Sequence, residues 1–166
     1  IKTAVTNLLL QSEDFSTTWS LNRLEAFGSG SVADAIASPA GTVTADRIEE
    51  STATGQHYVG QSFTAASGTT YTVSVYLKVD NADFAYISIE GAAFTTQRTL
   101  FDLGTETASA FTGSGFSFSI TSAGNGWFRC SMSNTATSSG AGFVLIGTVK
   151  ANSISYAGDA GTGIYL

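Results

Sequence analysis

The sequence predicts an all-β domain built as a two-sheet antiparallel β-sandwich. Three observations lead to this fold class. Apolar and polar residues alternate with a period of two in several segments, as in strands with one buried face. Gly, Asn, Asp and Ser separate these segments at the spacing of about 8–12 residues that is typical of sandwiches and barrels. Charged residues make up 12% of the 166 residues, about half the usual share, and long solvated helices would need more.

Four segments show the clearest alternation. In 71–79 the apolar face carries Tyr71, Val73 and Leu77, and the other face carries Thr, Ser, Tyr and Lys. Segments 84–90 and 116–121 follow the same pattern. In 143–149 Phe143, Leu145 and Val149 share a face with Gly147. We expect each segment to be a half-buried strand.

Weaker strand patterns complete the sheets. In chain order they lie at 19–27, 44–50, 57–64, 95–103, 127–134 and 153–156, and 164–166 starts a final strand. Only 45–51 carries enough charge to indicate a helical turn. No segment sustains a 3.6-residue period, which disfavours a parallel sheet with crossover helices. About ten antiparallel strands imply two packed sheets, and a jelly roll is the most frequent arrangement. With no linker or repeat, we expect residues 1–166 to form one domain.

Composition excludes several classes of protein. The net charge is −6 and the seven Lys and Arg residues are dispersed, so the basic stripe of a nucleic-acid-binding protein is absent. No apolar run approaches the roughly 20 residues that span a bilayer. The chain starts at Ile1 rather than Met, so we expect it to come from a longer or processed protein. The aromatic Trp19 and Trp127 are expected in the core or at corners. Cys130 alternates with apolar neighbours and is expected to be buried.

Catalytic motifs are missing from the sequence. His57 is the only histidine, and no nucleophile elbow is present. Paired carboxylates are the one open route to hydrolysis. Neighbours such as Glu49 and Glu50 would point to opposite faces of a strand, and the sequence does not place Glu90 next to Asp102. The sequence therefore favours a protein that is not an enzyme, with a hydrolase as the third hypothesis.

Aromatic and polar residues nominate a ligand-binding site. Tyr combines flat apolar area with a hydroxyl, which suits stacking against sugars. Tyr76 and Tyr86 lie on the polar faces of their strands; the alternative is an ordinary cross-strand pair. Arg98 offers a planar fork of donors for hydroxyls or a carboxylate, or is a solvated strand residue. His57 and Tyr58 open a strand after a turn, a usual place for contacts.

Three acidic residues near the chain ends nominate a structural calcium site. Calcium is bound by oxygen ligands, and jelly rolls often clamp their termini with such a cage. Glu13, Asp14 and Asp159 are the candidates. The alternative interpretation is that they are solvated turn carboxylates.

Several stretches together resemble a known family. Residues 7–16 (NLLLQSEDFS), followed by Trp19, resemble the first strand and turn of jelly-roll carbohydrate-binding modules. They are closer still to domains of tailed-phage structural and tail-fibre proteins. The phage-type pattern continues over nearly the whole chain, at 45–48 (ADRI), 68–78 (GTTYTVSVYLK), 101–105 (FDLGT), 124–130 (GNGWFRC) and 161–165 (GTGIY).

This resemblance implies a jelly roll with a non-catalytic role in glycan binding or on the virion surface. In the carbohydrate-binding modules, the stretch matching 56–61 (QHYVGQ) often carries a ligand-contacting aromatic, a position that Tyr58 fits with His57 beside it. The family strand that often contributes a calcium-binding acid would follow Leu166, where the sequence ends.

The leading functional hypothesis is a carbohydrate-binding module of phage or phage-like origin. It would bind a polysaccharide or cell-surface glycan by reversible stacking and hydroxyl hydrogen bonds, at the virion surface or outside the cell. We expect no nucleic-acid or membrane partner, and an oligomer within a parent particle is compatible with the sequence. The runner-up is a virion structural or decoration domain that uses the same face for protein–protein contacts.

Overall fold

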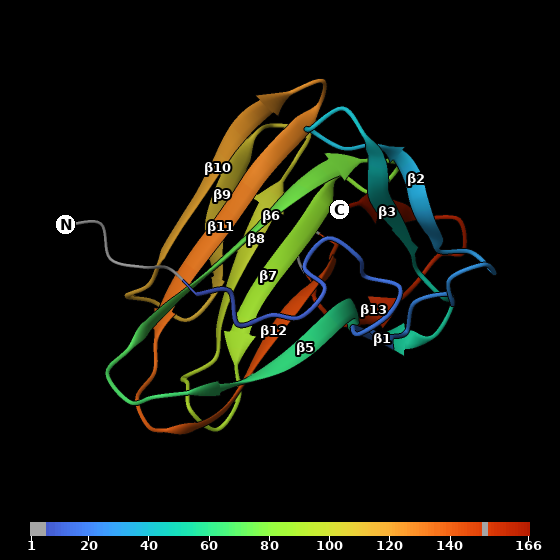
Figure 1. Ribbon diagram of the computed structural model, residues 1–166. Coiled ribbons are helices and arrows are strands. Elements are labelled where there is room, and N and C mark those ends of the chain that lie inside the picture. Colours follow the sequence, from blue (N-terminus) through green and yellow to red (C-terminus); the bar gives the residue numbers. More distant parts are fainter. Residues whose placement is uncertain (1–5, 151–152) are drawn as a thin grey trace.

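The structure is a computed structural model that describes residues 6–150 and 153–166; Ile1 and the other residues of 1–5, with 151–152, lie outside this part. All regular elements of the described residues are strands (Figure 1), so no helix there could span a membrane. The first sheet consists, in spatial order, of β1 (Ser20–Asn22), β5 (His57–Ala65), β12 (Gly140–Thr148), β7 (Phe84–Glu90), β8 (Gln97–Asp102) and β9 (Thr107–Thr112).

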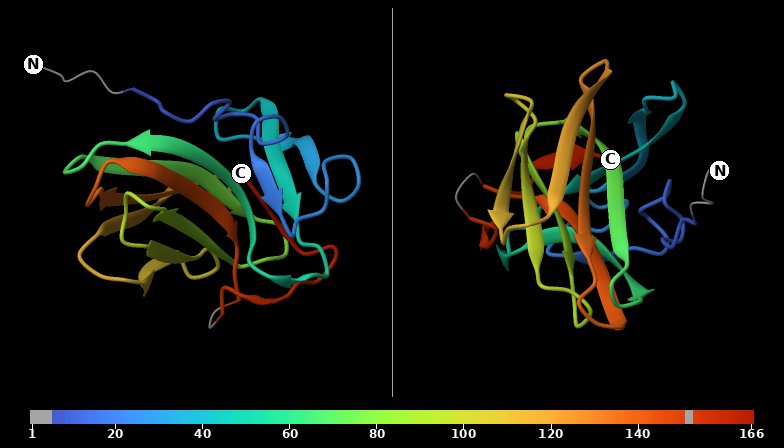
Figure 2. Two further views of the ribbon diagram at one scale, coloured as in Figure 1. Left: turned by 90° about the horizontal axis from the view of Figure 1, so that it is seen from below. Right: turned by 90° about the vertical axis from the view of Figure 1, so that its left-hand side faces the viewer.

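The second sheet also has six strands. In spatial order they are β10 (Ser117–Gly124), β11 (Trp127–Thr135), β6 (Thr70–Val79), β14 (Gly163–Tyr165), β3 (Val43–Glu49) and β2 (Val32–Ala37). A short additional pair joins β4 (Thr54–Gly55) to β13 (Tyr156–Ala157). In Figure 1 and in the left view of Figure 2, β2 and β3 lie at one end of the molecule and β9 and β10 at the other.

The connections between strands follow a jelly roll. The chain folds as a long hairpin whose arms pair with each other: β3 with β14, β5 with β12, and β6 with β11, all antiparallel. These pairs alternate between the sheets, since β5–β12 belongs to the first and the other two to the second. Such a wrapped double sheet defines the jelly roll. The predicted fold class is confirmed.

The main core lies between the sheets and follows the predicted alternation. Val73 and Leu77 of β6 belong to the same cluster of buried side chains as Ile87 and Ile89 of β7. Cys130 lies in the same cluster, and burial raises the pKa of its thiol to about 12. Trp127 is buried as expected and donates its indole N–H to the Ala37 carbonyl at 3.2 Å.

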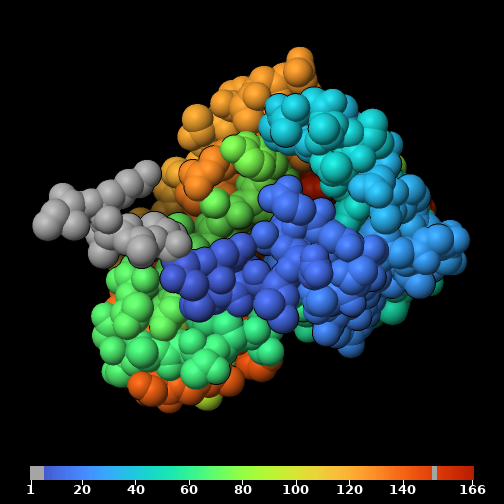
Figure 3. Space-filling view, in the orientation of Figure 1, coloured from blue at the N-terminus to red at the C-terminus, as the bar shows by residue number. Residues whose placement is uncertain are grey.

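The N-terminal segment covers one side of the sandwich. In Figure 3 it lies in dark blue between green and cyan segments. Phe15 and Trp19 pack into the core with ring centroids 4.8 Å apart. The Phe15 amide donates to the buried Asp46 carboxylate at 2.8 Å, and Leu10 is held by Gln61. Segment 19–27, which was predicted as a strand, is mostly loop, because only its residues 20–22 pair with β5.

Three further expectations about elements were wrong. The charged stretch 45–51 forms no helical turn; most of it belongs to β3, because the amides of Phe15 and Asp34 satisfy the Asp46 carboxylate. Strands β2 and β9, which lack clear alternation, were missed. The segment 143–149 is not half-buried: Val144 and Ile146 enter the main core, while Leu145 is buried on the opposite face.

Candidate functional site

Three of the five predicted ligand-binding residues lie together on the outer face of the first sheet, the face that points away from the main core. Tyr58 of β5, Gly147 of β12, Tyr86 of β7 and Leu100 of β8 are aligned by the strand register in one row. Arg98 pairs with Ser88 in the next row on the same face. Residues two apart on one strand share a face, so Tyr86 and Ser88 lie on the same side.

The alternation predicted that Tyr86 lies on a polar face, but the structure places it on a buried apolar one. Its exposed fraction is 0%, and it forms a second apolar cluster with Leu145 and Val149. Half-buried side chains pack around these three, among them Tyr58, Phe84, Leu100, Phe111 and Ile154. A ring without exposed surface offers no platform for stacking. Tyr86 therefore supports this face from beneath.

The Tyr86 hydroxyl has an unusual environment. Burial raises its pKa well above the ordinary tyrosine value, and the nearby Arg98 charge opposes that shift. The hydroxyl makes no hydrogen bond within the described residues. An unpaired buried polar group costs about 1–3 kcal/mol. The unpaired Tyr86 hydroxyl thus lowers the stability of the first sheet on the outer face, where several of its aromatic residues lie.

Arg98 and Glu90 form a partly buried ion pair on the same face. Arg98 Nη2 donates to Glu90 Oε2 at 2.8 Å, and the Ser88 hydroxyl donates to the same oxygen at 2.8 Å. Glu90 is therefore fixed by two donors. Arg98 Nε is buried and has no partner in the described part of the chain. The pair presents a donor and an acceptor side by side.

Exposed aromatic area lies beside this ion pair. Phe143 is paired with Glu90 in the strand register and has an exposed fraction of 42%. Tyr58 is half-buried, and Gly147 separates it from Tyr86. A Cβ at position 147 would lie 1.9 Å from the His57 carbonyl oxygen, so only glycine fits there. The arrangement offers rings for stacking and charged groups for hydroxyls.

His57 opens β5 after a turn, as predicted, but its side chain is buried and does not reach the surface. Its Nδ1 lies 2.6 Å from the Arg23 carbonyl oxygen and its Nε2 3.3 Å from that of Tyr156. The His57 and Tyr156 rings pack with centroids 4.8 Å apart. The ring also abuts Gly158, where a Cβ would come within 2.5 Å of it. Tertiary packing from the C-terminal part of the chain covers a position that looked like a turn.

Tyr76 lies on the other sheet, apart from Tyr58, Tyr86 and Arg98. Its exposed fraction is 43%, which agrees with the predicted polar face of β6. Arg129 is its neighbour in the strand register, and Arg129 Nη2 donates to the Ser74 hydroxyl at 2.9 Å. Tyr76 is an accessible aromatic surrounded by small polar residues.

The predicted calcium ligands do not form a cluster. Within residues 6–150 and 153–166, no three His, Cys, Asp or Glu side chains are placed to hold a metal ion. Asp14 accepts hydrogen bonds from the Ser16 amide and hydroxyl, and Asp159 forms an exposed ion pair with Lys150 at 3.1 Å. The structure does not bring Glu13, Asp14 and Asp159 together.

The candidate hydrolytic carboxylates are also separated. Asp102 pairs with Phe84 at the opposite end of β7 from Glu90. Six residues of strand correspond to about 20 Å, well beyond the roughly 5–9.5 Å between glycosidase carboxylates. Glu49 and Glu50 point into different surroundings: Glu50 is buried and accepts from the Tyr156 hydroxyl at 2.5 Å.

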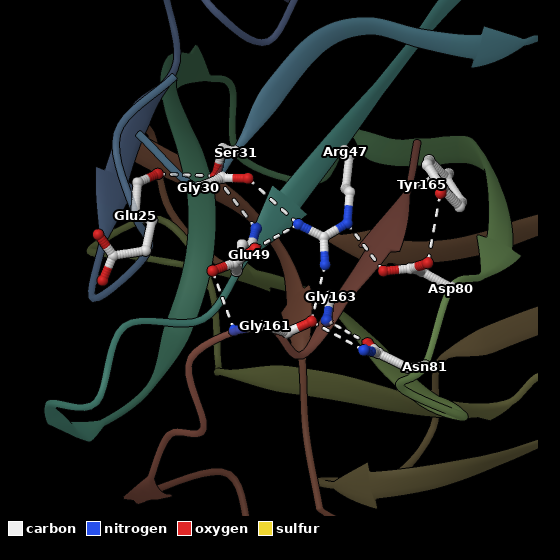
Figure 4. Close-up of polar contacts among 10 residues, drawn as sticks. All are labelled: Glu25, Gly30, Ser31, Arg47, Glu49, Asp80, Asn81, Gly161, Gly163 and Tyr165. Atoms are coloured by element: carbon white, nitrogen blue, oxygen red, sulfur yellow. Dashed lines mark hydrogen bonds and ion pairs between the residues drawn. The ribbon is translucent and has the colours of Figure 1, made fainter. Parts of the chain in front are cut away.

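A second polar cluster surrounds Arg47 on β3 (Figure 4). Its Nε donates to Asp80 at 2.8 Å, Nη2 to the Gly161 carbonyl at 2.7 Å, and Nη1 to Glu49 and to the Gly30 carbonyl. The hydrogen bond from Arg47 is the main reason why the pKa of Glu49 is lowered.

This cluster fastens the last strand to the second sheet. Asn81 accepts from the Gly163 amide at 2.7 Å and donates to the Gly161 carbonyl at 2.8 Å, and the Tyr165 hydroxyl donates to Asp80 at 3.3 Å. Because the Arg47 guanidinium is engaged on all three nitrogens, we interpret the cluster as structural.

The sequence nominated Tyr58 and Arg98 as candidate ligand-binding residues but did not predict Glu90 as the partner of Arg98. The spacing of two puts Glu90 on the same strand face as Tyr86 and Ser88, which the sequence does show. Its pairing with Arg98 depends on the register between β7 and β8, which the sequence does not show. In comparisons with known proteins, no family model and no curated protein matches this chain.

Proposed function

We propose that this chain is a non-catalytic carbohydrate-binding module that binds a polysaccharide or cell-surface glycan on the outer face of the first sheet. The observation that carries the proposal is the Arg98–Glu90 pair next to the exposed ring of Phe143. Each sugar hydroxyl can both donate and accept, and the pair offers one group of each kind. Aromatic faces complement the apolar C–H surface of a sugar ring.

The residues on this face make two kinds of contact with the ligand, stacking and hydrogen bonding. Tyr58 and Phe143 supply accessible ring area, while Arg98 and Glu90 hydrogen-bond to hydroxyls. No bond in the ligand is made or broken. We expect a dissociation constant of about μM to mM per site, strengthened by multivalency if the module is displayed on a phage-like particle or an extracellular protein.

A polysaccharide affinity gel followed by a glycan array tests this proposal. The wild-type chain should be retained by at least one polysaccharide, and Tyr58→Ala and Arg98→Gln should each weaken retention at least tenfold. Tyr76→Ala, on the other sheet, is the matched control and should bind like wild type. Absence of retention on every polysaccharide would overturn the proposal, and release of reducing sugar would replace it with a hydrolase.

The second candidate is a virion structural or decoration domain. It is favoured by the apolar character of the same face, where Phe143 is exposed and Leu100, Phe111 and Ile154 are half-buried. Contiguous apolar area on a surface often marks protein contacts. Sedimentation of the wild type and of Phe143→Ser would distinguish the candidates. Self-association that Phe143→Ser abolishes, without glycan retention, would favour the structural role.

A further inference from the structure

Among the described residues, the two large sheets end in four edge strands, β1, β9, β10 and β2. An edge strand leaves one row of backbone N–H and C=O groups unpaired, and proteins protect such rows with short strands, bulges or charged side chains. Strand β1 has only three residues. Strand β2 carries Asp34 and two register shifts against β3, and β9 has a register shift against β8. Three of the four edges are therefore protected.

Strand β10 lacks these protections along most of its length. It has eight residues, all of them uncharged. Its register against β11 is unbroken from Ser117 to Ser122, and the one shift lies at its last residues. On its other side, β10 makes no backbone hydrogen bond to a further strand of the described chain. Because backbone groups alternate in direction along a strand, every second residue of β10 turns its N–H and C=O toward solvent.

The main core is incompletely covered at this edge. Phe116, Phe118 and Ile120 pack against the core, yet each of them is only half-buried. Met132 and Cys130, which pair with Phe118 and Ile120 on β11, are almost fully buried. The Phe116 and Phe118 rings lie with their centroids 5.5 Å apart. Because burial of the remaining apolar area is favourable, this edge favours a partner that brings apolar side chains to the same place.

The two edge strands at this end of the sandwich carry no charge. No residue from 107 to 128 is Asp, Glu, Lys, Arg or His. This stretch includes both β9 and β10, which lie at the same end of the molecule (Figure 1). The chain as a whole has a net charge of −6, so a second copy is repelled by much of the surface. Along β9 and β10 a second copy meets no like charge.

An antiparallel second copy of β10 complements this edge. Opposite residues of paired strands share a face of the sheet, so a two-fold axis between two copies passes through a residue and not between two residues. An axis at Phe118 places Phe116 of each copy opposite Ile120 of the other, and the two Phe118 side chains opposite each other. Ser117 of each copy then lies opposite Ser119 of the other on the outer face. Apolar side chains thus meet apolar ones, and hydroxyls meet hydroxyls.

We propose that two copies of this chain form a symmetric dimer through β10, which joins their second sheets into one continuous sheet. The contact is isologous, because the same strand is used by both copies. At the rise of a strand β10 is about 26 Å long, and the edge of two packed sheets is about 20 Å thick, so about 1,000 Å² is buried in total. This area is near the lower limit for a specific interface, and we expect a dissociation constant of about 10–100 μM. The proposal does not depend on glycan binding.

Sedimentation velocity of the full chain between about 5 and 500 μM tests the proposal. The wild type should change from monomer to dimer over this range. A double variant, Ser117→Lys with Ser119→Lys, places like charges opposite each other at exposed positions and should stay monomeric, as should Ser117→Glu with Ser119→Glu. An equimolar mixture of the two double variants should restore the dimer, because each Lys then lies opposite a Glu. Recovery in the mixture also shows that both variants are folded.

Two controls alter the surface elsewhere. Ser62→Lys with Thr64→Lys makes the same change of charge at exposed positions of β5, which three strands separate from β9. This variant and Phe143→Ser should dimerise like the wild type. A wild type that stays monomeric, a dimer in the Ser117→Lys and Ser119→Lys variant, or no recovery in the mixture would overturn the proposal. Association that Phe143→Ser abolishes would also overturn it, and would favour the virion structural candidate.

Discussion

The outer faces of the two sheets differ in what their strands bury. On the first sheet, Tyr86, Leu145 and Val149 form a second small core. On the second sheet, the outer face of β6 and β11 carries Ser, Thr, Arg129 and the exposed Tyr76. Strands of both sheets alternate with a period of two, so the difference lies in which residues occupy the second face and in what surrounds them. The outer face of the first sheet carries an apolar cluster, whereas the outer face of β6 and β11 is polar and solvent-exposed.

The largest change in stability is expected when one residue on each outer face is replaced. Leu145→Ala should lower the free energy of unfolding by about 3 kcal/mol, because it opens a cavity in a buried cluster. Ser131→Ala, on the second sheet, should change it by less than about 0.5 kcal/mol. Urea denaturation measures both. Equal effects would contradict the claim that only one outer face is core-like.

The two partly buried arginines provide the next test. Arg47→Met should cost about 3 kcal/mol, since it leaves Asp80 and Glu49 without their counter-charge. Arg98→Met should cost about 1 kcal/mol, because in the described part of the chain the Arg98 side chain donates only to Glu90. The same denaturation assay compares them. A larger loss for Arg98→Met would mean that the first-sheet pair is needed for folding rather than available to a ligand.

Tyr86 is buried and Tyr76 is exposed, and removing the hydroxyl of the buried one should raise the stability of the protein rather than lower it. Tyr86→Phe should stabilise the protein by about 1 kcal/mol, because it removes a buried hydroxyl that has no partner among the described residues. Tyr76→Phe should be neutral, since its hydroxyl is solvated. Thermal unfolding of both variants against wild type is sufficient. A destabilised Tyr86→Phe would show that the hydroxyl does have a partner in solution.

The smallest expected effect is the dependence of stability on acid. The pKa of Glu49 is lowered in the folded state, so its ionised form contributes stability at neutral pH. That contribution is lost as the pH falls below about 4.5 and through the folded-state pKa, when protonation weakens the contact with Arg47. In Glu49→Gln the unfolding free energy should fall less steeply between pH 6 and about 3. The control, Glu13→Gln at an exposed position, should retain the wild-type slope.

How far the sequence predicts the site depends on how local each feature is. Tyr76 was placed correctly on a polar face, because alternation within β6 is a local property. Tyr86 has the same local pattern and was misplaced, because its burial depends on Leu145 and Val149 from another part of the chain.

By itself the sequence determined the all-β class, the core faces of β6 and β7, and the burial of Cys130 and Trp127. These follow from a period of two and from apolar side chains that must leave water. Only the tertiary structure decided that His57 is covered, that Arg98 meets Glu90 and that the first sheet is buried on both faces around Tyr86 and Leu145. Alternation states which residues share a face, but cross-strand register and packing between distant segments decide what that face meets.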